Sequence, residues 1–327
     1  MRSALKSGKI LVVKLAGIGD FILALPALEA LSSSRAEKLS ILCAERVRGL
    51  AERSPCLQEV FFLREPFFSF TTLFRNLKTI LLLRRKRFDL AINFHAIGSL
   101  RGLFIMKLLF VLLHAKARVL EVPVKKGKEI HEMAKYLEFL KMLDVTDVIS
   151  APSEISIPEA DEREIAELLG ERGLAAQEIL VGLQPGGNKE KFLWPISHFS
   201  RIARHLHERY NAAILVTGNQ KERALGEKLQ VELDFPVHNF CGLIPLEKMP
   251  AFLRRIDLFV SNDTGLIHLA GAVGTPLIGL YGPFSEKRFY PVHRSGKCVV
   301  IHKQEVASMG ELSSEEVIRA IDELLKR

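Results

Sequence analysis

The stretch DLFVSNDTGLIHLAGAVGTPLIGLY, residues 257–281, contains one complete strand–helix–strand unit. Its two apolar runs, 257–261 and 276–281, have the length and continuous hydrophobicity of parallel strands that are covered on both faces. Between them, residues 265–273 predict a helix. Parallel strands that alternate with helices form βαβ units, so this stretch predicts an α/β fold with a doubly wound sheet.

The same alternation extends over the rest of the chain. In the first half, helical stretches separate short apolar runs at 10–13, 39–43, 60–63 and 90–94. After Pro152 the pattern starts again, with strands expected near 178–184, 212–217, 257–261 and 276–281. We therefore expect two Rossmann-like doubly wound domains, residues 1–155 and 156–327, joined around 150–158.

Composition agrees with two globular domains and shows an uneven charge. The chain has 327 residues, of which 48% are hydrophobic and 26% charged, and this is enough to build two cores. Residues 1–150 carry 25 Lys and Arg against 14 Asp and Glu, whereas residues 151–327 carry 21 against 24. The four cysteines show no C-x-x-C pairing, which indicates reduced cytosolic thiols rather than a zinc site or a disulfide framework.

The basic first half is a candidate for peripheral membrane contact. Its longest apolar stretch, residues 102–115, contains Lys107 and is shorter than the about 20 residues that a transmembrane helix needs, and no secretory signal is apparent. Aromatic and aliphatic segments at 61–74 and 102–115 accompany the basic run RRKR at 84–87. This combination suits an anionic membrane surface or an anionic amphiphile, and buried helices with solvated charged edges are the alternative.

The loop after the first strand resembles a dinucleotide-binding loop only in part. It contains Gly17-x-Gly19 but no third glycine, and Asp20 follows directly. The second strand also ends in Leu42-Cys43-Ala44 rather than in the acid that binds a ribose, so NAD-dependent oxidoreduction is disfavoured. Asp20 is therefore either an ordinary helix cap or a residue with another role.

In the second half, the junction at 261–268 is the most informative loop. Asp263, Thr264 and Gly265 stand where a strand passes into a helix, so free backbone N–H groups and the helix dipole can receive an anion. His268 lies one turn further and could donate to a phosphate oxygen. A plain N-cap followed by a packed histidine remains the alternative.

Two further loops could contribute to the same site. The loop 184–195 combines Gly186 and Gly187 with two lysines, but it lacks the G-K-[ST] of a Walker loop. Glu222 follows another strand, a place from which an acid can hold ribose hydroxyls. A solvated turn and a surface helix start are the simpler interpretations of these two patterns.

Taken together, the motifs resemble glycosyltransferase family 9, the ADP-heptose:lipopolysaccharide heptosyltransferases. The resemblance is nearly full length and rests on five stretches in family order. They are VKLAGIGDFILALPALEAL, FDLAINFH (88–95), HEMAKYLEFLKMLDV (131–145), GLQPGG with WPISHFSRIARHL, and FVSNDTGLIHLAGAVGTPLIGLYGP (259–283). It implies a GT-B architecture, in which two Rossmann-like domains face each other across a cleft, and inverting transfer of heptose to a lipid-linked acceptor.

The resemblance also implies roles for particular residues. Asp20 matches the family's catalytic aspartate, the base that takes the proton of the acceptor hydroxyl, with Gly17 and Gly19 on the acceptor side. The expected donor-binding residues, which contact the sugar, the diphosphate or the ribose, are Lys191, Glu222, Asp263, Thr264, Gly265 and His268. The family pattern K-x-W-P is altered here to KEKFLWP, which displaces Lys191 by one position, so Lys189 is an alternative contact for the diphosphate.

The expected partners follow from this assignment: ADP-heptose, a lipopolysaccharide core or other anionic glycolipid acceptor, and the inner face of the cytoplasmic membrane. No cofactor, metal or nucleic acid is expected. Another transferase of the same family with a different donor or acceptor remains open. A non-catalytic nucleotide-sugar-binding protein is the second alternative, and the presence of both Asp20 and Asp263 argues against it.

Overall fold

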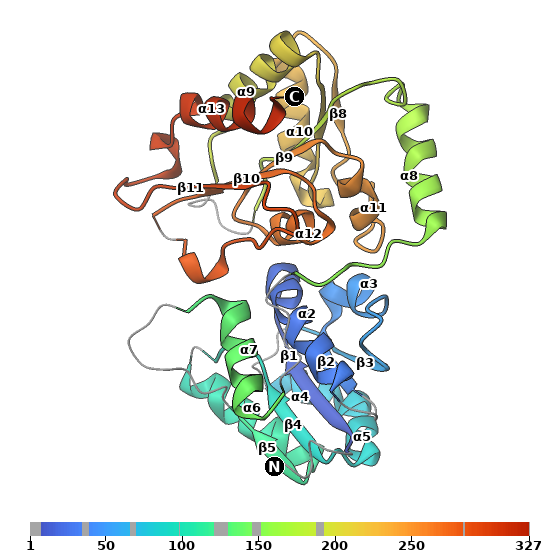
Figure 1. Ribbon diagram of the computed structural model, residues 1–327. Coiled ribbons are helices and arrows are strands. Elements are labelled where there is room, and N and C mark those ends of the chain that lie inside the picture. The colour runs from blue at the N-terminus through green and yellow to red at the C-terminus, as the bar shows by residue number, and fades with distance from the viewer. Residues whose placement is uncertain are drawn as a thin grey trace. The chain divides into compact units, whose positions relative to one another are not determined.

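A computed structural model describes residues 8–34, 39–65, 70–97, 99–120, 130–145, 152–187, 193–283 and 285–326. The chain divides into two compact units, Met1–Ser153 and Glu154–Arg327, and each has its own parallel sheet (Figure 1). These two sheets with their covering helices confirm the predicted α/β class and the two Rossmann-like domains.

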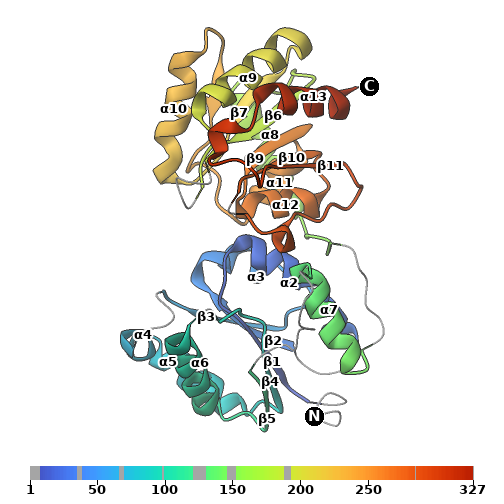
Figure 2. The same cartoon turned by 90° about the vertical axis from the view of Figure 1, so that its left-hand side faces the viewer.

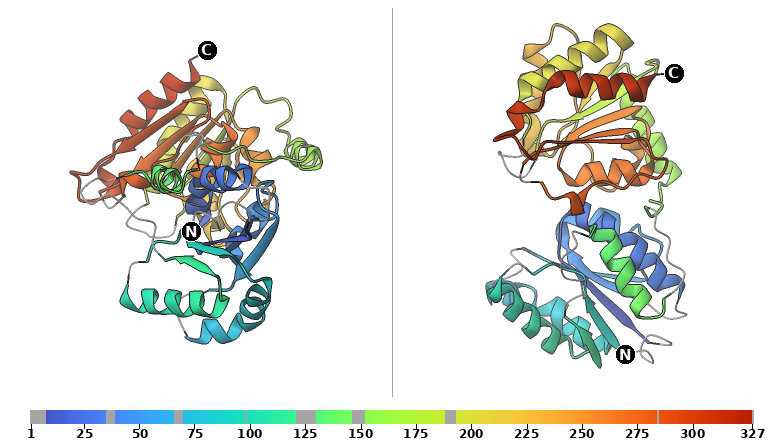
Figure 3. Two further views of the ribbon diagram at one scale, coloured as in Figure 1. Left: turned by 60° about the horizontal axis from the view of Figure 1, so that its bottom comes forward. Right: turned by 60° about the vertical axis from the view of Figure 1, so that its left-hand side comes forward.

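The N-terminal unit contains a parallel sheet of order β3-β2-β1-β4-β5. Its strands are β1 (Ile10–Lys14), β2 (Leu39–Ala44), β3 (Glu59–Leu63), β4 (Leu90–Asn93) and β5 (Ala117–Val119). Its helices are α2 (Ile18–Ser33), η1 (Glu45–Val47), α3 (Arg48–Ala51), α4 (Phe70–Arg75), α5 (Leu77–Lys86), α6 (Leu100–Leu113) and α7 (Glu132–Met142). The helices α5 and α6 cover one face of the sheet, and α2 and α7 cover the other (Figures 2 and 3).

The helix α2 begins at Ile18, directly after the extended Gly17, and continues through Pro26 to Ser33. Asp20 therefore lies in the first turn of the helix and does not occupy the N-cap position. Gly17 has φ −76°, and a Cβ placed on it would meet nothing within 4 Å. The backbone conformation at this position does not require glycine. The effect of the missing side chain is that the space beside the turn stays open.

The C-terminal unit contains a second parallel sheet, of order β11-β10-β9-β6-β7-β8. Its strands are β6 (Leu180–Gln184), β7 (Ala213–Val216), β8 (Val237–Asn239), β9 (Leu258–Asn262), β10 (Leu277–Tyr281) and β11 (Cys298–His302). The α-helices are α8 (Glu159–Glu171), α9 (Ile196–Tyr210), α10 (Arg223–Glu232), α11 (Met249–Arg254), α12 (Gly265–Val273) and α13 (Ser314–Leu325). Short 3-10 helices are η3 (Gln220–Glu222), η4 (Lys287–Phe289) and η5 (Met309–Glu311).

Each sheet has a point at which the direction of winding reverses, and ligands of doubly wound folds bind there, at the carboxyl ends of the strands. In the N-terminal sheet this point lies between β1 and β4, which pair directly. In the C-terminal sheet it lies between β6 and β9, which also pair. The loops that follow these four strands are therefore the first places to examine for a site.

Candidate functional site

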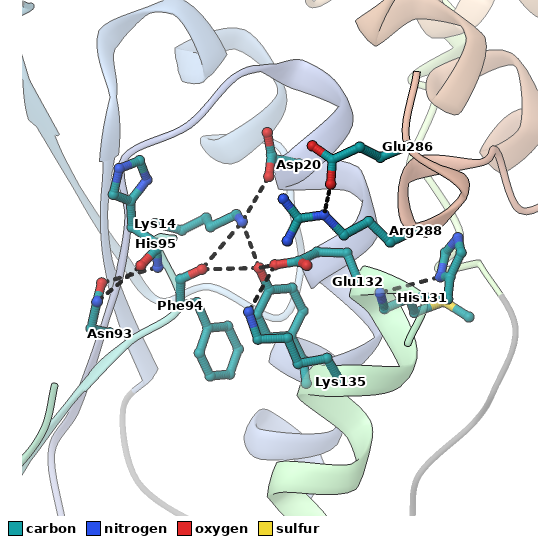
Figure 4. A network of polar contacts seen from close by, with 12 residues as sticks. Lys14, Asp20, Asn93, Phe94, His95, His131, Glu132, Lys135, Glu286 and Arg288 are labelled. Atoms are coloured by element: carbon teal, nitrogen blue, oxygen red, sulfur yellow. Dashed lines mark hydrogen bonds and ion pairs between the residues drawn. The ribbon is translucent and has the colours of Figure 1, made fainter. Parts of the chain in front are cut away.

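At the reversal point of the N-terminal sheet, a buried lysine joins three elements. Lys14 is the last residue of β1, and its side chain is 1% exposed. Its Nζ donates to Asp20 Oδ1 at 3.0 Å, to the Phe94 carbonyl at 3.2 Å and to Tyr136 Oη at 2.6 Å (Figure 4). Asp20 comes from the first turn of α2, Phe94 follows β4, and Tyr136 belongs to α7.

The tyrosine connects this lysine to a second carboxylate. Tyr136 Oη lies 2.6 Å from Glu132 Oε1 and 2.9 Å from the Phe94 carbonyl, and its ring stacks on the Phe94 ring at 4.5 Å between centroids. Glu132 is 1% exposed and also forms an ion pair with Lys135 at 3.3 Å. The contacts place two cations among two carboxylates, which compensates for burying these charges.

His95 follows Phe94 at the same edge of the sheet. Its backbone N–H donates to the Asn93 side chain at 3.0 Å. Burial lowers the pKa of His95 to about 4, the positive charge of Lys14 adds to this effect, and the negative charge of Asp20 opposes it. The imidazole is therefore neutral at physiological pH and adds no positive charge to this cluster.

At the reversal point of the C-terminal sheet, a hydroxyl and amide network connects β6 with β9. Thr264 Oγ1 donates to Gln184 Oε1 at 2.8 Å, and Ser261 Oγ donates to the same oxygen at 3.1 Å. Thr264 is the N-cap residue of α12, but its side chain forms no capping hydrogen bond. Because the Thr264 hydroxyl donates to Gln184, it does not cap the helix. The first backbone N–H groups of α12 therefore have no side-chain acceptor and can donate to an anion.

The neighbouring glycine loop is held by Asn262, the last residue of β9. Asn262 Nδ2 donates to the Pro185 carbonyl at 2.9 Å, and Asn262 Oδ1 accepts the Trp194 N–H at 3.0 Å. Trp194 is 1% exposed, and its indole N–H donates to the Leu312 carbonyl at 2.8 Å. Asn262 thus fixes the described residues on both sides of 188–192, a segment outside the described residues that includes Lys189 and Lys191.

Glu222 lies against two glycines of this sheet edge. Its Oε2 accepts the Asn219 N–H at 2.7 Å, which completes a capping box at the start of η3. A Cβ on Gly186 would come within 2.2 Å of Glu222 Oε1, and a Cβ on Gly218 would come within 2.6 Å of Oε2. Both glycines are therefore required for this position of the carboxylate.

Asp263 and His268 flank the start of α12. Burial raises the pKa of Asp263 above its ordinary value, and the negative charge of Glu286 adds a smaller contribution in the same direction. His268 is 5% exposed. Thr264, Gly265 and His268 all belong to the N-cap and first turns of one helix, as the sequence predicted, and Asp263 directly precedes them.

The sequence reasoning missed part of the N-terminal cluster. It identified Asp20, Gly17 and Gly19 but assigned no role to Lys14, Glu132 or Tyr136. A signal was present, since Lys14 is a charged residue inside an otherwise apolar strand, and charged side chains are almost never fully buried unless they are paired.

Two features are absent from the described residues: a cluster of metal ligands and a membrane-spanning helix. Among residues 8–34, 39–65, 70–97, 99–120, 130–145, 152–187, 193–283 and 285–326, no three His, Cys, Asp or Glu side chains gather closely enough to hold a metal ion. Within the same ranges, no helix has both the length and the apolar character needed to cross a bilayer.

The two Rossmann-like units have the GT-B fold that is found in glycosyltransferases. The sequence profile of glycosyltransferase family 9 (heptosyltransferase) matches residues 114–318, and the chain belongs to this family. Lipooligosaccharide heptosyltransferase 2 of Haemophilus influenzae is 32% identical over 141 residues, which are 41% of this chain and 38% of that protein. Similar matches to three other heptosyltransferases cover 39% to 47% of those proteins, so the chain matches less than half of their length.

Solved structures agree over almost the whole chain. The family 9 glycosyltransferase of Veillonella parvula has a TM-score of 0.82 at 20% identity, with 98% of each chain covered. The E. coli heptosyltransferase WaaC with ADP-2-deoxy-2-fluoro heptose has a TM-score of 0.70 at 18% identity, with 96% of this chain and 99% of that chain covered. At such identities these likenesses establish the fold.

Proposed function

We propose that the protein is an inverting glycosyltransferase that moves heptose from ADP-heptose to the inner core of lipopolysaccharide. The observation that carries the proposal is the placement of Asp20, whose carboxylate is fixed by the buried Lys14 at the ligand-binding edge of the N-terminal sheet. Membership of family 9 supports the transfer of heptose, and the complex of WaaC with a fluorinated ADP-heptose supports the donor.

Residues 1–155 bind the acceptor in this proposal, and residues 156–327 bind the donor. The uncapped N–H groups at Thr264 and Gly265 receive the diphosphate, assisted by Lys191 or Lys189 and by His268. Asp263 contacts the hydroxyls of the sugar, and Glu222 contacts the ribose. The support is that β6, β7 and β9 are neighbours in one sheet, so the loops after them share one edge.

The chemistry is a single displacement at the anomeric carbon. Asp20 accepts the proton of the acceptor hydroxyl, the oxygen of that hydroxyl forms the new glycosidic bond, and the bond to ADP breaks with its electron pair on the diphosphate. The helix end and a lysine stabilise the charge that develops on the leaving group. These donors are sufficient for a mechanism that does not require a metal.

A lipid-linked acceptor also requires contact with an anionic membrane, and we assign this contact to α4, α5 and α6. Of the ten large apolar side chains that are exposed among the described residues, seven belong to these helices. They are Phe74, Leu77, Leu81, Leu82, Leu100, Phe104 and Val111. Residues 70–119 contain ten Lys and Arg but one acidic residue, Asp89, and a basic, apolar surface of this kind binds anionic lipid headgroups.

The test of the proposed function is nucleotide release by the purified protein. A truncated lipopolysaccharide acceptor is mixed with ADP-heptose or with other nucleotide sugars, and we expect turnover with ADP-heptose. Asp20→Asn should lower turnover by about 100-fold or more while donor binding is retained. Asp234→Asn is the matched control, because the Asp234 side chain is 80% exposed and forms a surface ion pair with Arg204 at 2.6 Å.

The outcomes separate the alternatives. Faster release from a different nucleotide sugar would assign the protein to another reaction of the same family. Binding of nucleotide sugars without turnover of any of them would identify a non-catalytic binding protein. Unchanged turnover in Asp20→Asn would remove Asp20 from the mechanism.

A further inference from the structure

We propose that Lys14 is the positioning residue for the catalytic base, acting through Asp20 rather than on the substrates. This inference rests on the proposed function. Lys14 is 1% exposed, and its ammonium is directed at Asp20 from the end of β1 (Figure 4). The Nζ–Oδ1 distance of 3.0 Å is that of a charge-assisted hydrogen bond, which constrains the direction of the carboxylate as well as its charge.

The position of Lys14 is itself determined from three sides. Asp20, the Phe94 carbonyl and Tyr136 Oη accept its hydrogen bonds, which equals the number of protons on an ammonium group. Tyr136 is in turn held by its stacking on Phe94 and by Glu132. Through these contacts with Lys14, β4 and α7 help to orient the carboxylate of Asp20, which lies in the first turn of α2.

The energetics favour a functional interpretation of this lysine. Burial of an ammonium costs several kcal/mol, and a well-packed apolar side chain of similar volume is often at least as stabilising as a buried ion pair. The neighbouring residues of β1 are apolar and fully buried, so a strand core alone gives no reason for a cation. What the cation adds is a fixed, ionised Asp20 at the edge of the sheet.

During the reaction, the proposed role leaves Lys14 chemically unchanged. The acceptor proton passes to the Asp20 carboxylate, and Lys14 keeps its three protons throughout. Its contribution is that Asp20 is ionised and correctly oriented before the acceptor arrives, which lowers the cost of reaching the transition state. Loss of Lys14 should therefore reduce kcat and leave the binding of the donor largely intact.

A double-mutant cycle tests the inference with the full-length protein. The variants are Lys14→Met, Asp20→Asn and the combination of the two. The control is Lys9→Met, because Lys9 is exposed and directly precedes β1, at the end of the strand opposite to Lys14. Turnover, the KM for the donor and the affinity for ADP are measured for each variant, together with the free energy of unfolding in urea.

We expect Lys14→Met to lower kcat by about 30-fold or more, with the donor KM and the ADP affinity within about twofold of wild type. In the Asp20→Asn background, the same substitution should have less than about a threefold further effect, since residues that act as one unit are not additive. Multiplied losses in the double variant, or a kcat within about twofold of wild type in Lys14→Met, would overturn the inference.

A second variant covers the case in which Lys14→Met does not fold. Tyr136→Phe removes one of the three acceptors and keeps the cation, and we expect a loss of about fivefold in kcat that disappears in the Asp20→Asn background. A loss that persists there would overturn the inference.

The cycle also distinguishes failure of the inference from failure of the proposed function. If the wild type turns over ADP-heptose but the losses multiply, only the role of Lys14 is wrong. If no nucleotide sugar is turned over, the proposed function is wrong. The unfolding free energies of the four proteins still test the coupling of Lys14 to Asp20 in that case, and additive losses there refute it.

Discussion

Substitution of Gly186 by alanine should displace the side chain of Glu222 and thereby weaken binding of the nucleotide. An added Cβ would lie 2.2 Å from Glu222 Oε1 and 2.3 Å from its Cδ, distances that real Cβ contacts do not show. The Gly186 carbonyl accepts a hydrogen bond from Asn262 at 3.4 Å, and the preceding Pro185 carbonyl accepts one at 2.9 Å. Since the loop is held in this way and the glutamate side chain is flexible, the glutamate is the group that moves.

Two separate losses follow from this movement. The first is the hydrogen bond from the Asn219 N–H to Glu222 Oε2, a capping contact of a kind worth roughly 0.5–2 kcal/mol of stability. The second arises only if Glu222 binds the ribose. A hydrogen bond to a charged group contributes about 1.5–3 kcal/mol, which corresponds to about a 10- to 100-fold weaker Kd for ADP.

Titration calorimetry with ADP and unfolding in urea measure the two losses independently. Gly170→Ala is the matched control, because a Cβ at this position of α8 meets nothing within 4 Å. It should leave the ADP affinity unchanged and should stabilise the helix by up to about 1 kcal/mol. If Gly186→Ala lowers stability but binds ADP as wild type does, Glu222 is only a helix cap and the ribose assignment is refuted.

Three further predictions concern the other parts of the molecule. Asp263→Ala should weaken binding of ADP-heptose about 10-fold but that of ADP much less, and equal losses in calorimetry would indicate a structural cap. Burial lowers the pKa of His95 to about 4 from an ordinary value of 6.5, so the unfolded chain takes up this proton first as the pH falls. Between pH 6.5 and 4 the wild type should lose about 3 kcal/mol of unfolding free energy through this group. Urea denaturation should show a correspondingly smaller loss for His95→Gln over the same pH range. Identical pH dependence of the two proteins would contradict the assignment. Sedimentation of the protein with phosphatidylglycerol vesicles should be salt-sensitive and should decrease in a Leu100→Ser/Phe104→Ser variant. The control Val231→Ser, at a side chain of the C-terminal unit that is 87% exposed, should sediment as wild type does. Salt-independent or absent sedimentation would contradict the membrane contact.

Much of the fold could be predicted because its strands are continuous apolar runs and its helices lie between them. The predicted helix 265–273 agrees with α12. Short edge strands escaped the prediction: β5 and β8 contain three residues each, too few for a hydrophobic period to appear. They form because a neighbouring strand offers hydrogen-bonding partners, which is a tertiary effect.

The candidate site was predictable where one short segment contains all of its members. Asp263, Thr264, Gly265 and His268 fall within six residues, so one strand–helix junction brings them together. Lys14 and Tyr136 are 122 positions apart, and no local pattern joins them. Only the folding of α7 against α2 brings the tyrosine to the lysine, and the same applies to Glu222 beside Gly186.

The two units use the same local geometry to hold negative charges from different sources. In both, a strand at the reversal point passes into a helix whose first N–H groups favour a negative charge. In the C-terminal unit, α12 carries no side-chain cap at this end, so the proposed diphosphate can supply the charge. In the N-terminal unit, Asp20 supplies it from the first turn of α2.

This difference accounts for the glycine loop that ends in an aspartate. A carboxylate in the first turn of α2 occupies the region that a phosphate would need, and Lys14 adds a cation on the strand side of that carboxylate. The loop 17–20 is therefore unsuited to bind a nucleotide by its helix end, although its sequence resembles one that does. It is suited to hold one ionised carboxylate in a fixed orientation, which is the requirement for a general base.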